Sequence, residues 1–268
     1  MPRLVLLALH GMGDTDEHYS QALQEGLSER LGELWREVAV QPVWYSPVFQ
    51  GNENALWGAM AGEPANDLDS TLLRKLFLFG FADAAAFERS AHAEPATYRA
   101  VQRLIHDALV TGFRRCGNLP STPVIVIAQS LGGQVISSYL WDAQQGKHWF
   151  SDLPASTPDQ DAFVRLRSLR HLVTTGCNIP IFTAGLSRRV NFNRENPELS
   201  WHNFYDADDV LGWPLRQLDS VGNTYDWITD RPISAGNFLT GWNPASHLAY
   251  WTDRDVLKPV AEFIRRCL

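Results

Sequence analysis

A serine stands where a strongly apolar run meets a pair of glycines, in the stretch VIVIAQSLGGQ. The β-branched residues before it predict a buried strand, and the residues after it predict the first turns of a helix. Ser130 could act as an N-cap, because serine is common at the start of a helix. It could also be a nucleophile that a tight turn presents to a substrate.

The residues two positions before and two positions after Ser130 bear on this choice. A nucleophile on a sharp strand–helix turn needs small residues at both positions, because larger side chains would collide there. Ala128 and Gly132 meet this requirement, and Gly133 adds further room. A helix cap needs no such neighbours. The pattern, G-x-S-x-G with alanine in the first place, therefore favours a nucleophile at a helix N-terminus, where N–H groups stabilise developing negative charge.

A nucleophilic serine needs a base, and the base needs an orienting carboxylate. At such a turn the chain order is serine, acid, histidine. Of the histidines after Ser130, His148 would lie on or just after the elbow helix, and His171 and His202 would lie at the wrong ends of strands. His247, in NPASHLAYW, lies in a predicted loop before the last helix. We expect it to be the base.

The carboxylate is expected in the stretch WHNFYDADDVLGWPL, directly after a predicted strand. Asp208 is the expected acid, because acids in this setting commonly stand before an x-Val/Ile-hydrophobic sequence. Asp209 is the close alternative, and Asp206 is less favoured. Alternating carboxylates could also bind calcium, but no glycine and glutamate follow at the spacing of a calcium loop. An exposed turn with no catalytic role is the remaining possibility.

An oxyanion hole would complete the site, and the sequence HGMGDT after the first predicted strand can supply it. One donor is the N–H of the residue after the nucleophile, Leu131, and the second comes from an early loop. Met12 is the expected second donor, and Gly11 and Gly13 would let the backbone come close. We expect His10 to support this loop, because it precedes the serine on a different strand.

Apolar runs and helical patterns alternate along the whole chain. Strands are predicted at 3–9, 38–45, 123–128, 170–175 and 201–206, and helices at 17–38, 97–115, 131–144 and 254–266. This alternation predicts an α/β fold with a mostly parallel sheet and helices on both faces. In such folds ligands bind at the carboxyl ends of the strands.

We expect residues 1–268 to form a single domain, in which two insertions interrupt the alternation of strands and helices. One is 46–96, with an apolar, aromatic segment at 72–87, and the other is a polar stretch at 145–165. Loops of this length often carry function or form a lid. We expect 72–87 to be a helix packed on the core. The alternative is a cap that faces the substrate, and membrane contact is less favoured because the segment lacks a basic face.

Composition excludes several classes of protein. A net charge of −7 without a run of Lys or Arg argues against a nucleic-acid surface. Three scattered cysteines without a CxxC spacing give neither a disulfide framework nor a thiolate zinc site. The first apolar run, of about six residues, is shorter than the apolar region of a signal peptide, and no run is long enough to cross a bilayer. We therefore expect a cytoplasmic protein with no cofactor and no metal.

The chain resembles the lipase/esterase-like serine hydrolases of the α/β-hydrolase fold. HGMG, AQSLGG, DADDV and SHLAYW carry the resemblance, in the order that the family uses, over nearly the whole length except the two insertions. The resemblance implies hydrolysis of a carboxylic ester or related acyl bond through an acyl-enzyme, by a Ser-His-Asp triad. Ala128 departs from the usual glycine. An acyltransferase or thioesterase with the same triad, or a non-catalytic binding protein on this fold, are the alternatives.

Tryptophans crowd into the last quarter of the chain: Trp201, Trp213, Trp227, Trp242 and Trp251. We expect their large rings to pin irregular loops. An apolar acyl pocket or a sugar-stacking surface is the alternative. Many aromatic residues with few positive charges favour a neutral, apolar small-molecule ester as the substrate. The sequence carries no signal for the oligomeric state.

Overall fold

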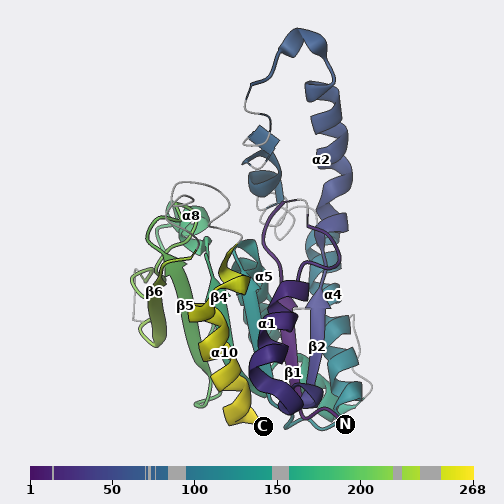
Figure 1. Ribbon diagram of the computed structural model, residues 1–268, viewed down its shortest axis with the longest axis vertical. Coiled ribbons are helices and arrows are strands. Elements are labelled where there is room, and N and C mark those ends of the chain that lie inside the picture. Colours follow the sequence, from purple (N-terminus) through teal and green to yellow (C-terminus); the bar gives the residue numbers. More distant parts are fainter. Residues whose placement is uncertain are drawn as a thin grey trace.

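The computed structural model describes residues 1–13, 15–69, 71, 74–75, 77–83, 95–146, 157–219, 225–235 and 249–268, with only the backbone of residues 52 and 95. Within this part of the chain, six strands form one sheet in the order β2-β1-β3-β4-β5-β6 (Figure 1). The strands are β1 (Leu4–Leu9), β2 (Val38–Val43), β3 (Val124–Gln129), β4 (Leu169–Thr175), β5 (Ser200–Asp206) and β6 (Ile228–Ile233). Every neighbouring pair is parallel, which confirms the predicted α/β class.

The central strands are buried on both faces, as their continuous apolar runs predict. Every residue of β1 and β3 is buried. Successive side chains of a strand point to opposite faces, so Val5 and Leu7 belong to one core cluster while Leu4 and Leu6 belong to the other. The sheet therefore separates two apolar layers, each of which needs helices to cover it.

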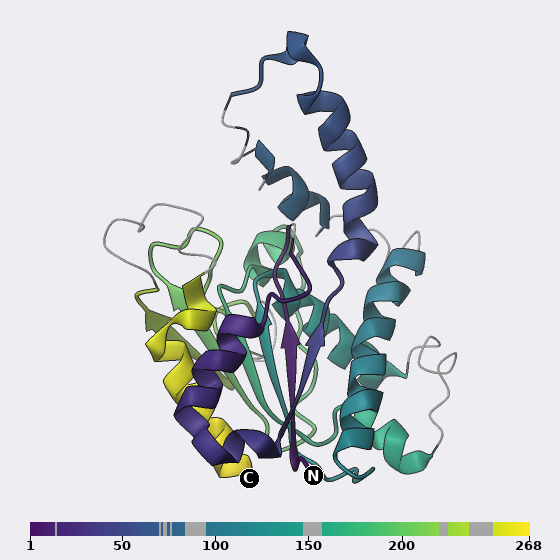
Figure 2. The same ribbon diagram turned by 45° about the vertical axis from the view of Figure 1, so that its right-hand side comes forward.

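Helices cover both faces of the sheet (Figure 2). Helices α1 (Gln21–Leu31) and α10 (Arg254–Cys267) pack on one face, and α4 (Pro95–Arg115) and α5 (Leu131–Gln145) pack on the other. Other helices in the described part of the chain are α2 (Ser46–Ala61), α7 (Pro158–Val164), α8 (Ile179–Thr183) and the 3₁₀ turns η1 (Gly32–Glu37), η2 (Pro64–Asn66) and η3 (Tyr250–Thr252). None of the described helices is long and apolar enough to cross a membrane.

The structure differs from the sequence prediction at three elements. The helix expected at 17–38 is α1 followed by η1, because Gly32, with φ of 57°, ends the α-helix. Part of the polar stretch 145–165 is α7, whose first turn is capped by the Thr157 side chain. Strand β6 was not predicted, because Pro232 lies within it. Proline is tolerated there since β6 is at the edge of the sheet.

The insertion 46–96 rises from the edge of the sheet where the strands end (Figure 1). Helix α2 begins three residues after β2, and residues 77–83 are also helical. Of the aromatic side chains in 77–83, Phe79 is buried, whereas Phe77 and Phe81 are exposed. The segment therefore packs against the protein on one side and presents aromatic rings on the other.

Candidate active site

Ser130 lies between the end of β3 and the first residue of α5 in a conformation that L residues rarely adopt. Its φ is 51° and its ψ is −120°. Non-glycine residues with positive φ are uncommon, and such strain concentrates at functional sites. The Ser130 side chain makes no capping hydrogen bond to the helix. The helix-cap role therefore does not account for the serine at this position.

Hydrogen bonds from the main chain hold the turn at Ser130. The Ser130 N–H donates to the Thr175 carbonyl at the end of β4 at 2.9 Å, and the Gly133 N–H donates to the Ser130 carbonyl at 3.0 Å. The turn is thus attached to the neighbouring strand and to its own helix. Only 1% of Ser130 is exposed.

Glycines let the turn lie against the end of β1. A Cβ atom on Gly132 would come within 2.6 Å of the His10 carbonyl oxygen and 2.9 Å of the Leu9 carbonyl oxygen. A Cβ on Gly11 would come within 3.1 Å of the Ser130 Cβ. The small residue two positions after Ser130 is therefore required by contact with β1. Ala128 is fully buried in β3.

Two N–H groups near Ser130 have no acceptor in the described part of the chain. They belong to Met12, in the 10–13 loop, and to Leu131, the first residue of α5. The loop lies next to the serine because Gly11 and Ser130 are in contact. Unpaired N–H groups beside a nucleophile are what an oxyanion hole requires.

His10 supports the loop as a neutral imidazole. The Tyr45 N–H donates to Nε2 at 3.1 Å, so Nδ1 carries the hydrogen and donates to the Gly11 carbonyl at 2.6 Å. The ring stacks on Tyr45 with centroids 3.8 Å apart. Burial lowers the pKa of His10 to about 4. Both ring nitrogens are occupied, so His10 has none left to take a proton from Ser130.

The three carboxylates at the end of β5 and in the loop after it have different surroundings. Asp206 is buried, and its Oδ1 accepts the Asp208 N–H at 2.9 Å. Asp208 is exposed. Asp209 is only 5% exposed, and its Oδ1 accepts the Leu211 N–H at 3.0 Å while Oδ2 accepts the Tyr250 hydroxyl at 2.8 Å. Of the two favoured acids, only Asp209 is held in a buried position.

The expected base, His247, lies in 236–248, outside the described residues, as does Trp242. His148 is also outside them. The chain after this gap is tied to the candidate site. The Tyr250 hydroxyl, besides donating to Asp209, accepts the Asp206 N–H at 2.9 Å.

Trp251 makes a second tie, because its Nε1 donates to Thr175 Oγ1 at 3.2 Å. Thr175 also accepts the N–H of Ser130. The segment that resumes two residues after His247 therefore contacts both Asp209 and the strand end beside Ser130.

His171 and His202 lie near the amino ends of β4 and β5, as expected. Both rings stack on Phe263 of α10, with centroids 4.4 Å apart in each pair. Burial lowers the pKa of each to about 4. Ser130 lies at the opposite edge of the sheet, so these histidines belong to the packing of α10.

Asn178 is a residue of the site that the sequence analysis missed. It follows the end of β4, is fully buried, and donates from Nδ2 to Ser130 Oγ at 3.3 Å. A donor to Oγ leaves the serine hydroxyl hydrogen available to a base. Asn178 follows the strand predicted at 170–175, and this position was the signal that could have identified it. The carboxyl ends of parallel strands meet at one edge of the sheet, so a residue just beyond one strand can lie beside Ser130.

Among the described residues, the late tryptophans lie partly in the core and partly in loops. Trp201 is fully buried and packs against Phe192 and Trp227, with centroids 5.5 Å and 5.8 Å away. Trp213 is exposed, and its Nε1 donates to the Val210 carbonyl in the loop after β5. These rings pin loops around the sheet.

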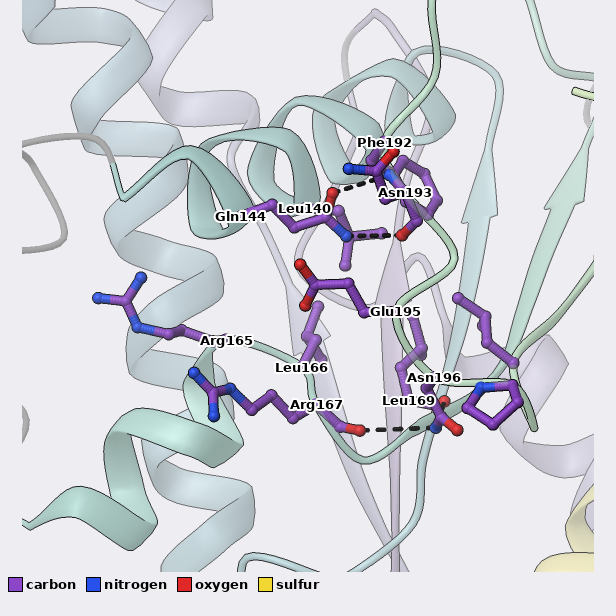
Figure 3. A pocket seen from close by; sticks show the side chains of 12 residues that line it. Leu140, Gln144, Arg165, Leu166, Arg167, Leu169, Phe192, Asn193, Glu195 and Asn196 are labelled. Carbon is purple, nitrogen blue, oxygen red and sulfur yellow. Dashed lines mark hydrogen bonds between the residues drawn. The ribbon is translucent and has the colours of Figure 1, made fainter. Parts of the chain in front are cut away.

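A pocket of about 540 Å³ lies away from Ser130, at the amino ends of β4 and β5 (Figure 3). It is lined by polar side chains such as Gln144 and Glu195, and Arg165 at its rim is paired with Asp161 at 2.9 Å. No group of three metal-ligating side chains converges within the described part of the chain. The candidate site is therefore built from the serine, its neighbouring N–H groups and the buried carboxylate.

The fold and this turn together define a class, an α/β fold with a strained serine at the carboxyl edge of a parallel sheet. This is the arrangement that the resemblance to α/β-hydrolases implied. No protein-family model matches the sequence. No curated protein matches it either.

Solved structures similar to the chain include two esterases. One is an iodinated complex of acetyl xylan esterase, with a TM-score of 0.42 and 15% identity over 99% of this chain and 98% of that one. Another is a cutinase-like protein from Cryptococcus sp., with a TM-score of 0.38 and 12% identity over 99% of this chain and 94% of that one. Likenesses with these TM-scores and identities do not assign a function to the chain.

Proposed function

We propose that this protein is a serine hydrolase that cleaves a carboxylic ester or a related acyl bond. The observation that carries the proposal is the strained backbone of Ser130, with φ of 51°, between a buried strand and a helix N-terminus. A conformation that costs on the order of 1–3 kcal/mol persists only where the surroundings enforce it. A nucleophile elbow uses this conformation to direct the serine Oγ toward the carboxyl edge of the sheet, where a substrate binds.

We assign His247 as the base and Asp209, rather than Asp208, as the orienting acid. A triad acid is buried and accepts hydrogen bonds that fix its orientation. Asp209 has both properties, whereas Asp208 is exposed. Support for His247 comes from its neighbour Tyr250, whose hydroxyl donates to Asp209. The order of serine, acid and histidine along the chain agrees with this assignment.

The reaction follows from these roles. His247 takes the hydroxyl proton while Ser130 Oγ attacks the carbonyl carbon of the substrate. The N–H groups of Met12 and Leu131 stabilise the oxyanion, and His247 then protonates the leaving group. A water molecule, deprotonated by His247, attacks the acyl-enzyme and releases the acid. Asp209 fixes the imidazole tautomer and stabilises the imidazolium that forms in each step.

A neutral, apolar ester is the substrate class that we propose. Aromatic side chains lie above the carboxyl edge of the sheet, where the exposed rings of Phe77 and Phe81 stack with centroids 5.8 Å apart. Phe81 also meets Phe182 of α8 edge to face at 6.3 Å. Helix α8 follows Asn178, which contacts Ser130. The aromatic cluster thus reaches from the insertion toward the serine.

The test is to replace Ser130 with alanine and measure hydrolysis of p-nitrophenyl esters of graded acyl length. Because all chemistry passes through Oγ, we expect kcat to fall by roughly 10⁴-fold or more. A fluorophosphonate probe should label the parent protein and fail to label the variant. Ser168→Ala, at a buried serine before the amino end of β4, is the matched control and should leave both readouts unchanged. Near-normal hydrolysis by Ser130→Ala would refute the proposal.

A further inference from the structure

The 10–13 loop is held by a carboxyl group that comes from the insertion. The Gly13 N–H donates to Asp83 Oδ2 at 2.7 Å, across 70 positions of sequence. Asp83 is only 3% exposed. The acceptor therefore holds Gly13, the residue next to the proposed oxyanion donor Met12.

The same helical segment also contacts the side chain of Met12. A Cβ atom on Gly80 would come within 2.6 Å of Met12 Sδ, so the two residues pack closely. Met12 Sδ in turn lies 3.9 Å from Nδ2 of Asn178, the residue that donates to Ser130. Segment 77–83 thus contacts the 10–13 loop both at the Gly13 main chain and at the Met12 side chain.

A second carboxyl group, from Glu53 of α2, lies within hydrogen-bonding reach of Asp83. Both residues are buried, at 3% exposure for Asp83 and 7% for Glu53. One oxygen of each, Asp83 Oδ1 and Glu53 Oε2, is buried with no donor among the described residues. A proton held between the two groups would satisfy both oxygens, because one carboxyl O–H can donate to the other carboxylate.

We propose that Glu53 and Asp83 form a shared-proton carboxyl pair that positions the 10–13 loop, and with it the oxyanion donor Met12, for catalysis. The pair joins two parts of the insertion to the main body of the site. It makes the insertion a support of the reaction centre. This inference rests on the proposed function, because it concerns a donor of that reaction.

The state of the pair follows from its surroundings. Burial and the neighbouring Glu53 raise the pKa of Asp83 to about 8. The hydrogen bond from the Gly13 N–H opposes this shift. Burial also raises the pKa of Glu53, while its hydrogen bond with Asp83 opposes the shift. The charge of Asp83 in turn acts on Tyr45, the residue that precedes α2. Burial raises the pKa of Tyr45 well above its ordinary value, so it stays neutral. We therefore expect the pair to hold one proton at neutral pH and to lose it as the pH rises through about 8, where two carboxylates would repel each other.

The test compares Asp83→Ala with Asp83→Asn in the full-length protein. Alanine leaves the Gly13 N–H without its acceptor, so the oxyanion donor shifts. We expect kcat to fall roughly 10- to 100-fold, with KM within about threefold of the parent, because substrate binding is not removed. An asparagine amide accepts from Gly13 and donates to Glu53, as the protonated carboxyl does. We therefore expect Asp83→Asn to keep most of kcat.

A second readout uses only the variant that preserves the fold. The parent should lose kcat as pH rises through 8, whereas Asp83→Asn, which has no proton to lose, should not. This comparison decides the question even if Asp83→Ala fails to fold. Asp69→Ala, at an exposed residue of the insertion, is the control and should behave as the parent.

The possible outcomes separate this inference from the proposed function. If the parent shows no hydrolysis that depends on Ser130, the proposed function fails and the inference fails with it. If the parent is active and Asp83→Ala keeps full kcat, only the inference is overturned. An alkaline loss that is the same in the parent and in Asp83→Asn also overturns it.

Discussion

Ser130 combines a strained backbone with a side chain that is hydrogen-bonded yet able to give up its proton. The main chain is held by the Thr175 carbonyl, at 2.9 Å from the Ser130 nitrogen. The Oγ atom accepts from Asn178 at 3.3 Å. An accepted hydrogen bond stabilises the oxygen as negative charge develops during proton transfer. In the proposed mechanism Asn178 is thus a positioning residue for Ser130.

The identity of the acid can be tested at single residues, by Asp209→Asn and Asp208→Asn. Asparagine at 209 keeps the volume but removes the charge that stabilises the imidazolium, so we expect kcat to fall by roughly 10³- to 10⁴-fold. Asp208→Asn, at an exposed side chain, should change kcat by less than about threefold. Steady-state hydrolysis of p-nitrophenyl acetate, with melting temperatures as a folding check, measures both. A larger loss in Asp208→Asn would restore the acid expected from the sequence.

Residues could be predicted from the sequence where their signal is local. Ser130 stands two positions from each of the small residues that mark its turn, Ala128 and Gly132. Asp208 and Asp209 are adjacent, and only tertiary packing buries one and exposes the other. Asn178 and Asp83 meet their partners across 48 and 70 positions. No spacing rule joins residues so far apart.

The start of α5 packs closely against the end of β1, and this contact can be tested at Gly132. Gly132→Ala would put a Cβ 2.6 Å from the His10 carbonyl oxygen. Main-chain atoms of a buried strand cannot move away cheaply, so we expect a loss of about 1–3 kcal/mol in the free energy of unfolding. We also expect reduced kcat, because the Ser130 turn must shift. Urea denaturation and ester hydrolysis measure the two effects.

Gly58→Ala is the matched control for this substitution. Gly58 lies within α2, and a Cβ there meets nothing within 4 Å. Alanine should stabilise the helix by roughly 0.5–1 kcal/mol, because glycine loses more conformational freedom on folding. Equal effects of the two substitutions would show that the contact with β1 is not what requires glycine at 132.

Elements were predictable where one signal dominated. The strands at the centre of the sheet have continuous apolar runs, and β1 and β3 were predicted within a residue or two. Strand β6 has one buried residue and an internal proline, so its sequence ITDRPI carries a weak strand signal. Its place at the sheet edge comes from pairing with β5, which local sequence does not encode.

The whole molecule brings four distant segments together at one edge of the sheet. The 10–13 loop, the insertion, the turn at Ser130 and the loop after β5 all lie beyond the carboxyl ends of the strands (Figures 1 and 2). The alternation of strands and helices predicted this edge as the site. It did not predict how the insertion meets the loop, because that contact depends on the path of 46–96 in three dimensions.

Stability of the whole fold should depend on histidines that are buried in the neutral form. His10, His171 and His202 each have a pKa lowered by burial from 6.5 to about 4. The unfolded chain binds protons more tightly at these histidines than the folded protein does. Above pH 6.5 they are neutral in both states, so they do not reduce the free energy of unfolding. That stability is lost progressively as pH falls from 6.5 toward 4. We expect the urea midpoint to drop clearly between pH 7.5 and pH 5.

Replacing both His171 and His202 with glutamine isolates their share of this acid destabilisation. Both imidazoles hydrogen-bond with Ser200 Oγ, at 2.7 Å for His171 and 3.1 Å for His202. Glutamine can still hydrogen-bond with this hydroxyl but takes up no proton, so the double variant should lose less stability than the parent between pH 7.5 and pH 5. His18→Gln, at an exposed histidine, should follow the parent curve. A double variant that loses as much as the parent would mean that carboxylates, and not these two histidines, govern the acid limb of stability.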